Sequence, residues 1–177
     1  GKHYRLYTKF GSHPMTLDGV DGTYFAVWAP SAKAVSVIGD FNFWNDKQHR
    51  LNVRWDGSGI WEGFIPDALE GMRYKYKIKS HHNDVVTEKA DPYAYSYEHP
   101  PNTASVIATI DGYKWKDKAW MGYRKDKNGL DKPYSVYEVH LGSWMRNGED
   151  NSFLTYRQLA EKLVAYVKEM NFTHVEF

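Results

Sequence analysis

The stretch YSVYEVHLGSW, residues 134–144, divides the chain into two parts with different residue patterns. Its central residues form two alternating sets with few polar members: Tyr137, Val139 and Leu141 in one, Val136, Glu138 and His140 in the other. Such a run is typical of a strand that is buried on both faces, as strands of parallel sheets are. We predict a strand here that ends at Gly142.

A helix with a well-defined start is predicted after this strand. Thr155 and Gln158 have the T-x-x-Q spacing of a capping box. Apolar residues then recur at intervals of three and four and predict one buried stripe, formed by Tyr156, Leu159, Ala160, Leu163, Val164 and Val167. Asn171 is a candidate left-handed C-cap. An extended run from Thr173 to Phe177 follows, so the pattern predicts a strand–helix–strand unit with parallel strands.

This unit matches the repeating element of a (β/α)8 barrel. A whole barrel needs about 250 residues, so residues 134–177 are expected to supply only its first strand, first helix and second strand. Val136, Val139 and Leu141 are expected to be buried, yet the strands that would cover them are not in this chain. Uncovered edges and apolar faces promote pairing with other chains, and we therefore expect self-association through this incomplete unit.

Residues 19–110 have the short strands and regular turn signals of an all-β sandwich. The clearest alternation is Arg73–Lys79, which predicts an inner and a wet face: Tyr74, Tyr76 and Ile78 inside, Lys75, Lys77 and Lys79 outside. Trp28 and Trp61 lie in alternating runs and are predicted to be core residues. A last strand is predicted over Ala104–Ile110.

Two segments flank this sandwich. Residues 1–18 show no clear period and are interpreted as a lead-in. Residues 111–133 are rich in lysine and aspartate and are predicted to be a connecting loop, which docks through Trp115, Trp120 and Met121.

The predicted fold class is therefore mainly β: an immunoglobulin-like β-sandwich followed by the first β-α-β unit of a truncated (β/α)8 barrel, over residues 134–177.

Composition excludes several classes of partner. Lysine and arginine number 23 against 22 acidic residues, a formal charge of +1, so no field of one sign favours nucleic acid or an anionic membrane. The absence of cysteine excludes disulfides and thiolate metal sites. No apolar run is long enough to span a membrane and the N-terminus has no signal-peptide core, so a cytoplasmic protein is expected.

No motif indicates a cofactor or a catalytic centre. His81, His82 and Asp84 could be read as metal ligands, but neighbouring side chains on a strand or turn point apart, and a solvated hairpin tip is the favoured reading. The sequence has no phosphate-binding glycine loop and no nucleophile elbow. We therefore expect no metal, no cofactor and no catalytic residue in this chain.

Several motifs nevertheless resemble those of one family. YEVHLGSW at 137–144 resembles the first barrel strand of bacterial glycogen branching enzymes, which belong to the α-amylase superfamily. Other pieces agree with that family in order along the chain: WAP at 28–30, GDFNFW at 39–44, GIWE at 59–62, YKYKI at 74–78, ADPYA at 90–94 and FTHVE at 172–176. GDFNFW and YKYKI also resemble the glycogen-binding sandwich modules of pullulanases, isoamylases and kinase regulatory subunits.

The resemblance implies an enzyme that cleaves an α-1,4-glucan and transfers the segment to a 6-hydroxyl, with retention through two carboxylates. In the family these acids lie on later barrel strands, so no catalytic residue can be assigned and the chain alone is expected to be inactive. An alternative from another class is a non-catalytic glycogen-targeting or regulatory subunit that contains the same sandwich. Another sandwich-bearing superfamily member, such as a debranching enzyme, is the third possibility.

The resemblance also implies a binding site for α-glucan. Trp44, which closes GDFNFW, corresponds to the family's sugar-stacking tryptophan, and Lys75 would donate hydrogen bonds to hydroxyls; alternatively, Lys75 is only a solvated lysine. Sandwich modules often use a second tryptophan in the next hairpin, but residues 80–84 contain none. Three residues would face the active-site mouth of a complete barrel: Tyr137, His140 and Trp144, although Tyr137 could instead fill the barrel interior.

Overall fold

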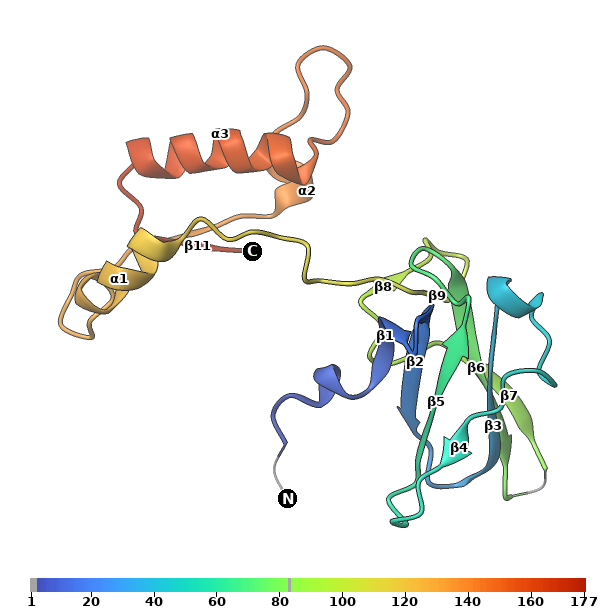
Figure 1. Cartoon of the computed structure of the whole chain (residues 1–177). Helices are drawn as coiled ribbons and strands as arrows, with labels where there is room; N and C mark the ends of the chain where they lie inside the picture. Colours follow the sequence, from blue (N-terminus) through green and yellow to red (C-terminus); the bar gives the residue numbers. More distant parts are fainter. Residues whose placement is uncertain (1–2, 83) are drawn as a thin grey trace. The chain divides into compact units, whose positions relative to one another are not determined.

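The computed structural model describes residues 3–82 and 84–177 and divides into two compact units, the first ending at Lys114 and the second spanning Trp115–Phe177. Gly1 and Lys2 of the predicted lead-in and Asn83 of the predicted hairpin tip lie outside the described residues. The first unit contains these elements (Figure 1): η1 Leu6–Thr8, β1 Gly11–Leu17, β2 Val20–Trp28, β3 Ala32–Gly39, η2 Asp40–Asn42, β4 Asn52–Val53, β5 Ile60–Pro66, β6 Arg73–Ser80, β7 Val86–Lys89, β8 Ser96–Tyr97 and β9 Ser105–Val106. The second contains α1 Lys118–Lys127, β10 Val136–Glu138, α2 Leu141–Trp144, α3 Tyr156–Glu169 and β11 His174–Glu176.

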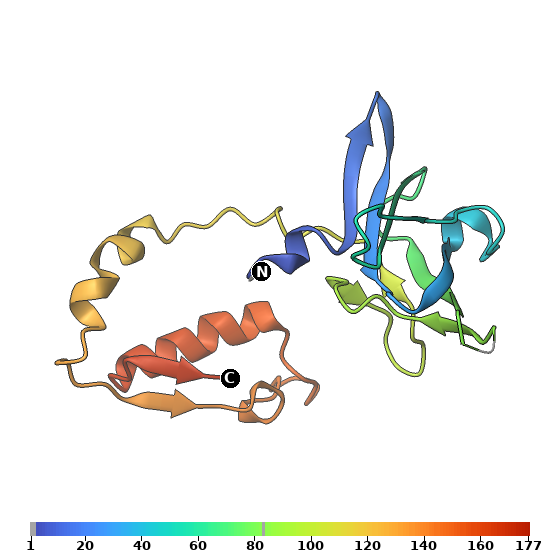
Figure 2. The same cartoon turned by 90° about the horizontal axis from the view of Figure 1, so that it is seen from below.

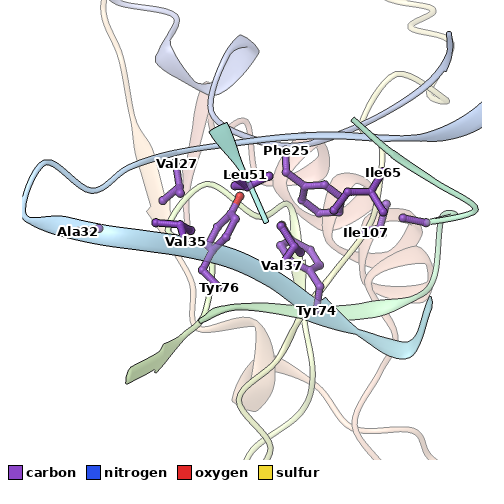
Figure 3. Packing of buried hydrophobic residues seen from close by; sticks show 11 residues of the cluster. Phe25, Val27, Ala32, Val35, Val37, Leu51, Ile65, Tyr74, Tyr76 and Ile107 are labelled. Carbon is purple, nitrogen blue, oxygen red and sulfur yellow. The ribbon is translucent and has the colours of Figure 1, made fainter. Parts of the chain in front are cut away.

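Two antiparallel sheets form the sandwich of the first unit. One has the strand order β1-β2-β5-β4, and the other the order β3-β6-β9-β8 with β7 also paired to β6. Both sheets contribute buried side chains to one core (Figure 3): Phe25, Val27, Ala32, Val35, Val37, Leu51, Ile65, Ala68, Tyr74, Tyr76 and Ile107. The predicted inner position of Tyr74 and Tyr76 on β6 is confirmed. The mainly β sandwich predicted from the strand pattern is thus present.

The sandwich begins earlier in the chain than predicted. Strand β1, which falls in the predicted lead-in of residues 1–18, pairs with β2 along its whole length, from Gly11 opposite Ala26 to Leu17 opposite Val20. It is an edge strand, where a residue such as Pro14 is tolerated because only one side of the strand is hydrogen-bonded. Gly11 and Pro14 interrupt the alternation of apolar and polar residues that would have predicted a strand here.

Two other predictions for this unit are wrong. Trp28 is 63% exposed, because the alternation of β2 places Phe25 and Val27 in the core and Trp28 on the outer face; Trp61, by contrast, packs against the core as predicted. Of the predicted strand Ala104–Ile110, only Ser105–Val106 is extended. The Ile107 amide still bonds to the Met72 carbonyl at 2.9 Å, the next position of the same register, but the Ile107 carbonyl accepts from the Gly71 amide at 2.8 Å, so the regular pairing ends there.

The second unit is built on a parallel strand pair with a helix against it. Strands β10 and β11 pair in parallel, with Tyr137 opposite Val175, and Figure 2 shows them side by side near α3. Val139 is buried against Leu163 and Val167 of α3. The predicted parallel pairing is therefore present.

The start of α3 has the predicted capping box. The Thr155 amide donates to Gln158 Oε1 at 2.9 Å, and the Gln158 amide donates to Thr155 Oγ1 at 3.4 Å. After the helix, Asn171 has a left-handed φ of 58°, as predicted. The buried stripe is narrower than predicted, because Tyr156, Ala160 and Val164 are exposed.

Three predictions for the second unit are corrected. Residues 118–127 of the predicted loop form α1, because Lys, Ala, Met and Arg favour helices and the pairs Trp120/Arg124 and Tyr123/Lys127 support it through cation–π contacts. The first strand ends at Glu138, since the amides of the next helical turn, α2, bond locally to the His140 carbonyl. Val136, predicted to be buried, is 42% exposed, because α3 covers the opposite face of the strand pair.

Among the described residues, every helix is too short or too polar to cross a membrane.

One buried carboxylate organises the aromatic core of the sandwich. Asp91 Oδ2 accepts hydrogen bonds from the hydroxyls of Tyr74 and Tyr76 at 2.7 and 3.0 Å, and Asp91 Oδ1 accepts from the Tyr93 amide at 2.8 Å. Burial raises the pKa of Asp91, while these hydrogen bonds oppose the shift. Without the carboxylate, the buried Tyr74 hydroxyl would lose its acceptor, and the Tyr76 hydroxyl would keep only the longer bond to the Ala26 carbonyl, at 3.4 Å.

We expect Asp91→Ala to lower the free energy of unfolding by about 2–4 kcal/mol, because buried donors left without an acceptor cost about 1–3 kcal/mol each. Asp91→Asn, which keeps one acceptor oxygen, should cost less. Asp21→Ala, at an exposed aspartate, is the control and should stay within about 0.5 kcal/mol of the parent. Urea unfolding measures all three, and equal stability of Asp91→Ala and Asp21→Ala would contradict this account of the core.

Candidate functional site

A tight loop at the end of β3 presents the aromatic residues of the GDFNFW motif. Residues Asp40–Asn42 form a 3-10 turn, and the amide of Trp44 returns to the carbonyl of Gly39 at 2.9 Å. Phe43 and Trp44 have left-handed φ values of 53° and 61°, which residues with a side chain adopt only when the surroundings impose them. The turn directs both rings to the surface, where Phe43 is 93% and Trp44 36% exposed.

A buried amide holds this loop in place. Asn42 is 1% exposed; its Oδ1 accepts from the Gly39 amide, and its Nδ2 donates to the Val37 carbonyl and to His49 Nδ1, all at 2.9 Å. Burial lowers the pKa of His49, which favours the neutral ring that can accept from the amide. Asn42 thus ties the turn both to β3 and to the segment that follows it.

Gly39 lets the loop start close to the neighbouring strand. A Cβ atom at this position would lie 2.3 Å from the carbonyl oxygen of Arg73, far inside van der Waals contact, so a side chain here would push β3 away from β6. Neither Gly39 nor Asn42 was among the predicted site residues. The signal that could have identified them is the motif itself, because a glycine, an aspartate and an asparagine within four residues are typical of a tight turn.

Lys75 lies on β6 directly opposite Ile38, the residue before Gly39. Its side chain is half-buried and Nζ donates to Thr103 Oγ1 at 2.8 Å, so it is more constrained than a freely solvated lysine. Lys77 points to the same face of β6, and its Nζ lies 3.3 Å from Asp46 Oδ2 in the segment after Trp44. The chain around Trp44 therefore folds onto the face of the sheet that carries Lys75.

A shallow hollow of about 320 Å³ lies on this same face, lined by Ala34, Ser36, Asp46, Lys47, Arg50, Lys77, Lys79 and Val86. None of the described residues that line it is aromatic, and residues 80–84 contain no tryptophan. Six of its eight lining residues have hydrogen-bonding side chains. The face as a whole thus combines one exposed indole with several polar groups, an arrangement that suits a neutral polyhydroxylated ligand.

The residues predicted at a barrel mouth take up different positions within the second unit. Tyr137 and Trp144 lie together, since Trp144 Nε1 donates to the Tyr137 hydroxyl at 3.0 Å. The Tyr137 ring also packs against Tyr166 and Phe172, with centroids 5.4 and 5.0 Å away. His140 is exposed and its Nδ1 lies 2.9 Å from Ser143 Oγ.

The His81, His82 and Asp84 segment carries a different interaction from the one a metal site would need. The Asp84 carboxylate lies 3.3 Å from both Lys33 Nζ and Lys79 Nζ, and these lysines lower its pKa. In the part of the chain that the structure describes, no cluster of three or more histidine or acidic side chains could hold a metal ion.

Comparison with known proteins gives this surface a context. Residues 9–94 match the carbohydrate-binding module 48 family (isoamylase N-terminal domain). Over 176 residues, 99% of this chain, the sequence is 51% identical to a 1,4-alpha-glucan branching enzyme of Rhodospirillum rubrum and to one of Albidiferax ferrireducens. The chain spans about a quarter of the length of these relatives, 24% and 27%. The resemblance predicted from the motifs is confirmed.

Solved structures share the fold at lower sequence identity. A Klebsiella pneumoniae pullulanase complexed with maltotriose matches 94% of this chain and 17% of its own, with a TM-score of 0.62 and 21% identity. A putative alpha amylase from Salmonella typhimurium also matches 94% of this chain and 24% of its own, with a TM-score of 0.62 and 19% identity. Likeness at this identity concerns the fold alone.

We expect Asn42→Ala to destabilise the sandwich by about 1–3 kcal/mol, because three groups lose a buried hydrogen-bond partner. The matched control is Asn45→Ala, at an exposed asparagine of the same loop whose Oδ1 accepts from the nearby Lys47 amide. Urea unfolding of the two variants tests the role of the buried amide. A loss no larger for Asn42→Ala than for Asn45→Ala would show that the loop holds its shape without it.

Proposed function

We propose that this chain, which belongs to the family of 1,4-alpha-glucan branching enzymes, is the non-catalytic α-glucan-binding region of such an enzyme. The whole enzyme would cleave an α-1,4-glucan and transfer the released segment to a 6-hydroxyl, forming an α-1,6 branch. The observation that carries the proposal is the exposed Trp44 indole on a rigid turn, inside the stretch that matches a carbohydrate-binding module. The cytoplasmic location of the protein stays a prediction.

The identity to branching enzymes favours this function over the alternatives. It extends over 99% of the chain, including residues 95–177 outside the matched module. A targeting or regulatory subunit that shared only the sandwich would not be expected to match over the second unit. The level of identity favours a branching enzyme over a debranching enzyme, since 51% of residues are shared with the Rhodospirillum rubrum branching enzyme and 21% with the pullulanase.

Two side chains would make the contacts with the glucan. The flat Trp44 ring would stack on the apolar face of a glucosyl unit, with the neighbouring Phe43 ring adding exposed surface. Lys75 would donate to hydroxyls of the same chain, because its ammonium has donors beyond the one that Thr103 accepts. A shallow site of this kind binds weakly. Within a whole enzyme it would keep the polymer near the active site and raise the local substrate concentration.

We also propose that residues 134–177 form the opening of the catalytic barrel, with β10 as its first strand, α3 as its first helix and β11 as its second strand. The parallel register of β10 and β11 and the packing of α3 against Val139 support this. His140 and Trp144 follow the carboxyl end of the first strand and would then lie toward the active-site mouth. The Tyr137 ring packs against Tyr166 of α3 and Phe172 and would face the helix side of the strand pair. No catalytic acid is assigned to this chain, and by itself it would be inactive.

Trp44→Ala should weaken binding to glycogen by about five- to tenfold, because a stacking ring contributes roughly 1 kcal/mol or more. Affinity electrophoresis in gels with increasing glycogen measures the change. Trp55→Ala is the matched control, since Trp55 is 98% exposed but lies in the turn after β4, on the other sheet. Equal retardation of Trp44→Ala and the parent protein would place the glucan site elsewhere.

We further expect copies of the chain to self-associate through the second unit, because Val136 and Val175 of the strand pair and Phe177 after β11 are exposed. Light scattering over a range of concentrations should show a mass that rises above that of one chain. The rise should disappear in a protein shortened after Lys114, which keeps the first unit. A monomeric parent protein, or association that persists in the shortened one, would refute this role of the second unit.

A further inference from the structure

We propose that Arg73 is a positioning residue for the glucan site, which it serves by holding Asp40 and, through Asp40, the indole of Trp44. This inference rests on the proposed function, because it assigns a role to Arg73 in the same site. Arg73 is the first residue of β6 and lies 33 positions from Asp40 in the sequence. The sequence motifs give no indication of it.

The contact between Arg73 and Asp40 is a fork with two parallel bonds. Arg73 Nε donates to Asp40 Oδ2 at 3.0 Å and Arg73 Nη2 donates to Asp40 Oδ1 at 2.9 Å. The Arg73 amide also donates to Asp40 Oδ2, at 2.9 Å. These bonds hold the pKa of Asp40 below its usual value. A carboxylate held by a guanidinium fork and a backbone amide has a fixed orientation.

The fixed carboxylate belongs to the turn that carries the indole. The Phe43 amide donates to the Asp40 carbonyl at 3.5 Å and the Trp44 amide to the Gly39 carbonyl at 2.9 Å, and the nearby Trp44 side chain helps to lower the pKa of the Asp40 carboxyl. Asp40 is also the first residue of the 3-10 turn that ends before Phe43 and Trp44. A single carboxylate therefore connects β6, the start of the turn and the ring that the turn presents.

A second carboxylate orients the arginine itself. Arg73 Nη1 donates to Glu98 Oε1 at 3.2 Å, and Glu98 Oε2 accepts from the Ala104 amide at 3.1 Å. The guanidinium thus lies between two acids. Isolated surface ion pairs contribute little to stability, but bidentate pairs in a network are the exception. The Arg73 side chain is half exposed, so we expect the main effect on the conformation of the loop rather than on global unfolding.

Positioning matters here because the turn is intrinsically unfavourable. Phe43 and Trp44 are adjacent left-handed residues, a conformation that costs on the order of 1 kcal/mol or more per residue. If Asp40 were no longer held by Arg73, the Trp44 indole could leave its exposed orientation, and glucan binding would have to provide the free energy that orders the loop again. A site with a single stacking ring has little binding free energy to offset that cost.

The test compares Arg73→Met with Arg54→Met in the full chain. Both substitutions remove a guanidinium with similar exposure from an ion pair, but Arg54 pairs with Glu62 on the other sheet, at 3.2 Å. Two readouts are needed: the glycogen affinity from affinity electrophoresis, and the NMR resonance of the Trp44 indole N–H, assigned with Trp44→Phe. Asp40→Asn, which keeps the shape of the side chain, provides a second variant, and Arg73→Lys tests partial rescue.

We expect Arg73→Met and Asp40→Asn to bind glycogen about three- to tenfold more weakly than the parent and to shift the Trp44 indole resonance. Arg54→Met should match the parent in both readouts and Arg73→Lys should lie between. If Trp44→Ala loses binding while Arg73→Met keeps it, the positioning role is wrong and the glucan site stands. If Arg54→Met and Arg73→Met lose affinity equally, a general charge effect replaces the positioning role. If Trp44→Ala binds like the parent, the proposed glucan site itself fails, and the role of Arg73 with it.

Discussion

The antiparallel ladder between β3 and β6 is the constraint on which the rest of the first unit depends. Its register places Gly39 opposite Tyr74 and Ile38 opposite Lys75. Because side chains alternate along a strand, one ladder directs Tyr74 and Tyr76 to the core and Lys75 and Lys77 to the outer face, and a slip by one residue would exchange the two sets. It also brings the first residue of β6 beside the turn that follows β3. Core and candidate site are thus set by the same pairing.

The parts of the fold that depend on local patterns could be predicted from the sequence. Strict alternation identified the two faces of β6, and the spacing of Thr155 and Gln158 identified the start of α3. The errors fall where local pattern and tertiary context disagree. Trp28 is as hydrophobic as a core residue, yet the alternation of side chains along β2 places it on the outer face of the sheet. Residues 118–127 are as highly charged as a loop, yet their helix-forming residues and cation–π pairs make them helical.

Only some residues of the candidate site could be identified from the sequence. Trp44 and Lys75 could be named because they lie in motifs that resemble those of glucan-binding modules, and their role stays a proposal. The groups that build the loop around Trp44 could not be found in this way. Asn42 acts through its burial, and Asp40 and Arg73 meet only after β3 and β6 pair. Contacts between residues far apart in the chain leave no periodic signal.

The central claim is that a rigid turn presents Trp44 to a glucan on the outer face of the sheet that contains β3 and β6. An NMR titration of the protein with a soluble malto-oligosaccharide tests it most directly. The account predicts that the largest shifts occur at the Trp44 indole, Phe43 and Lys75, with little change in β1 and β5. Shifts that cluster on the opposite sheet, around Trp28 and Tyr24, while the Trp44 indole stays unchanged, would contradict it.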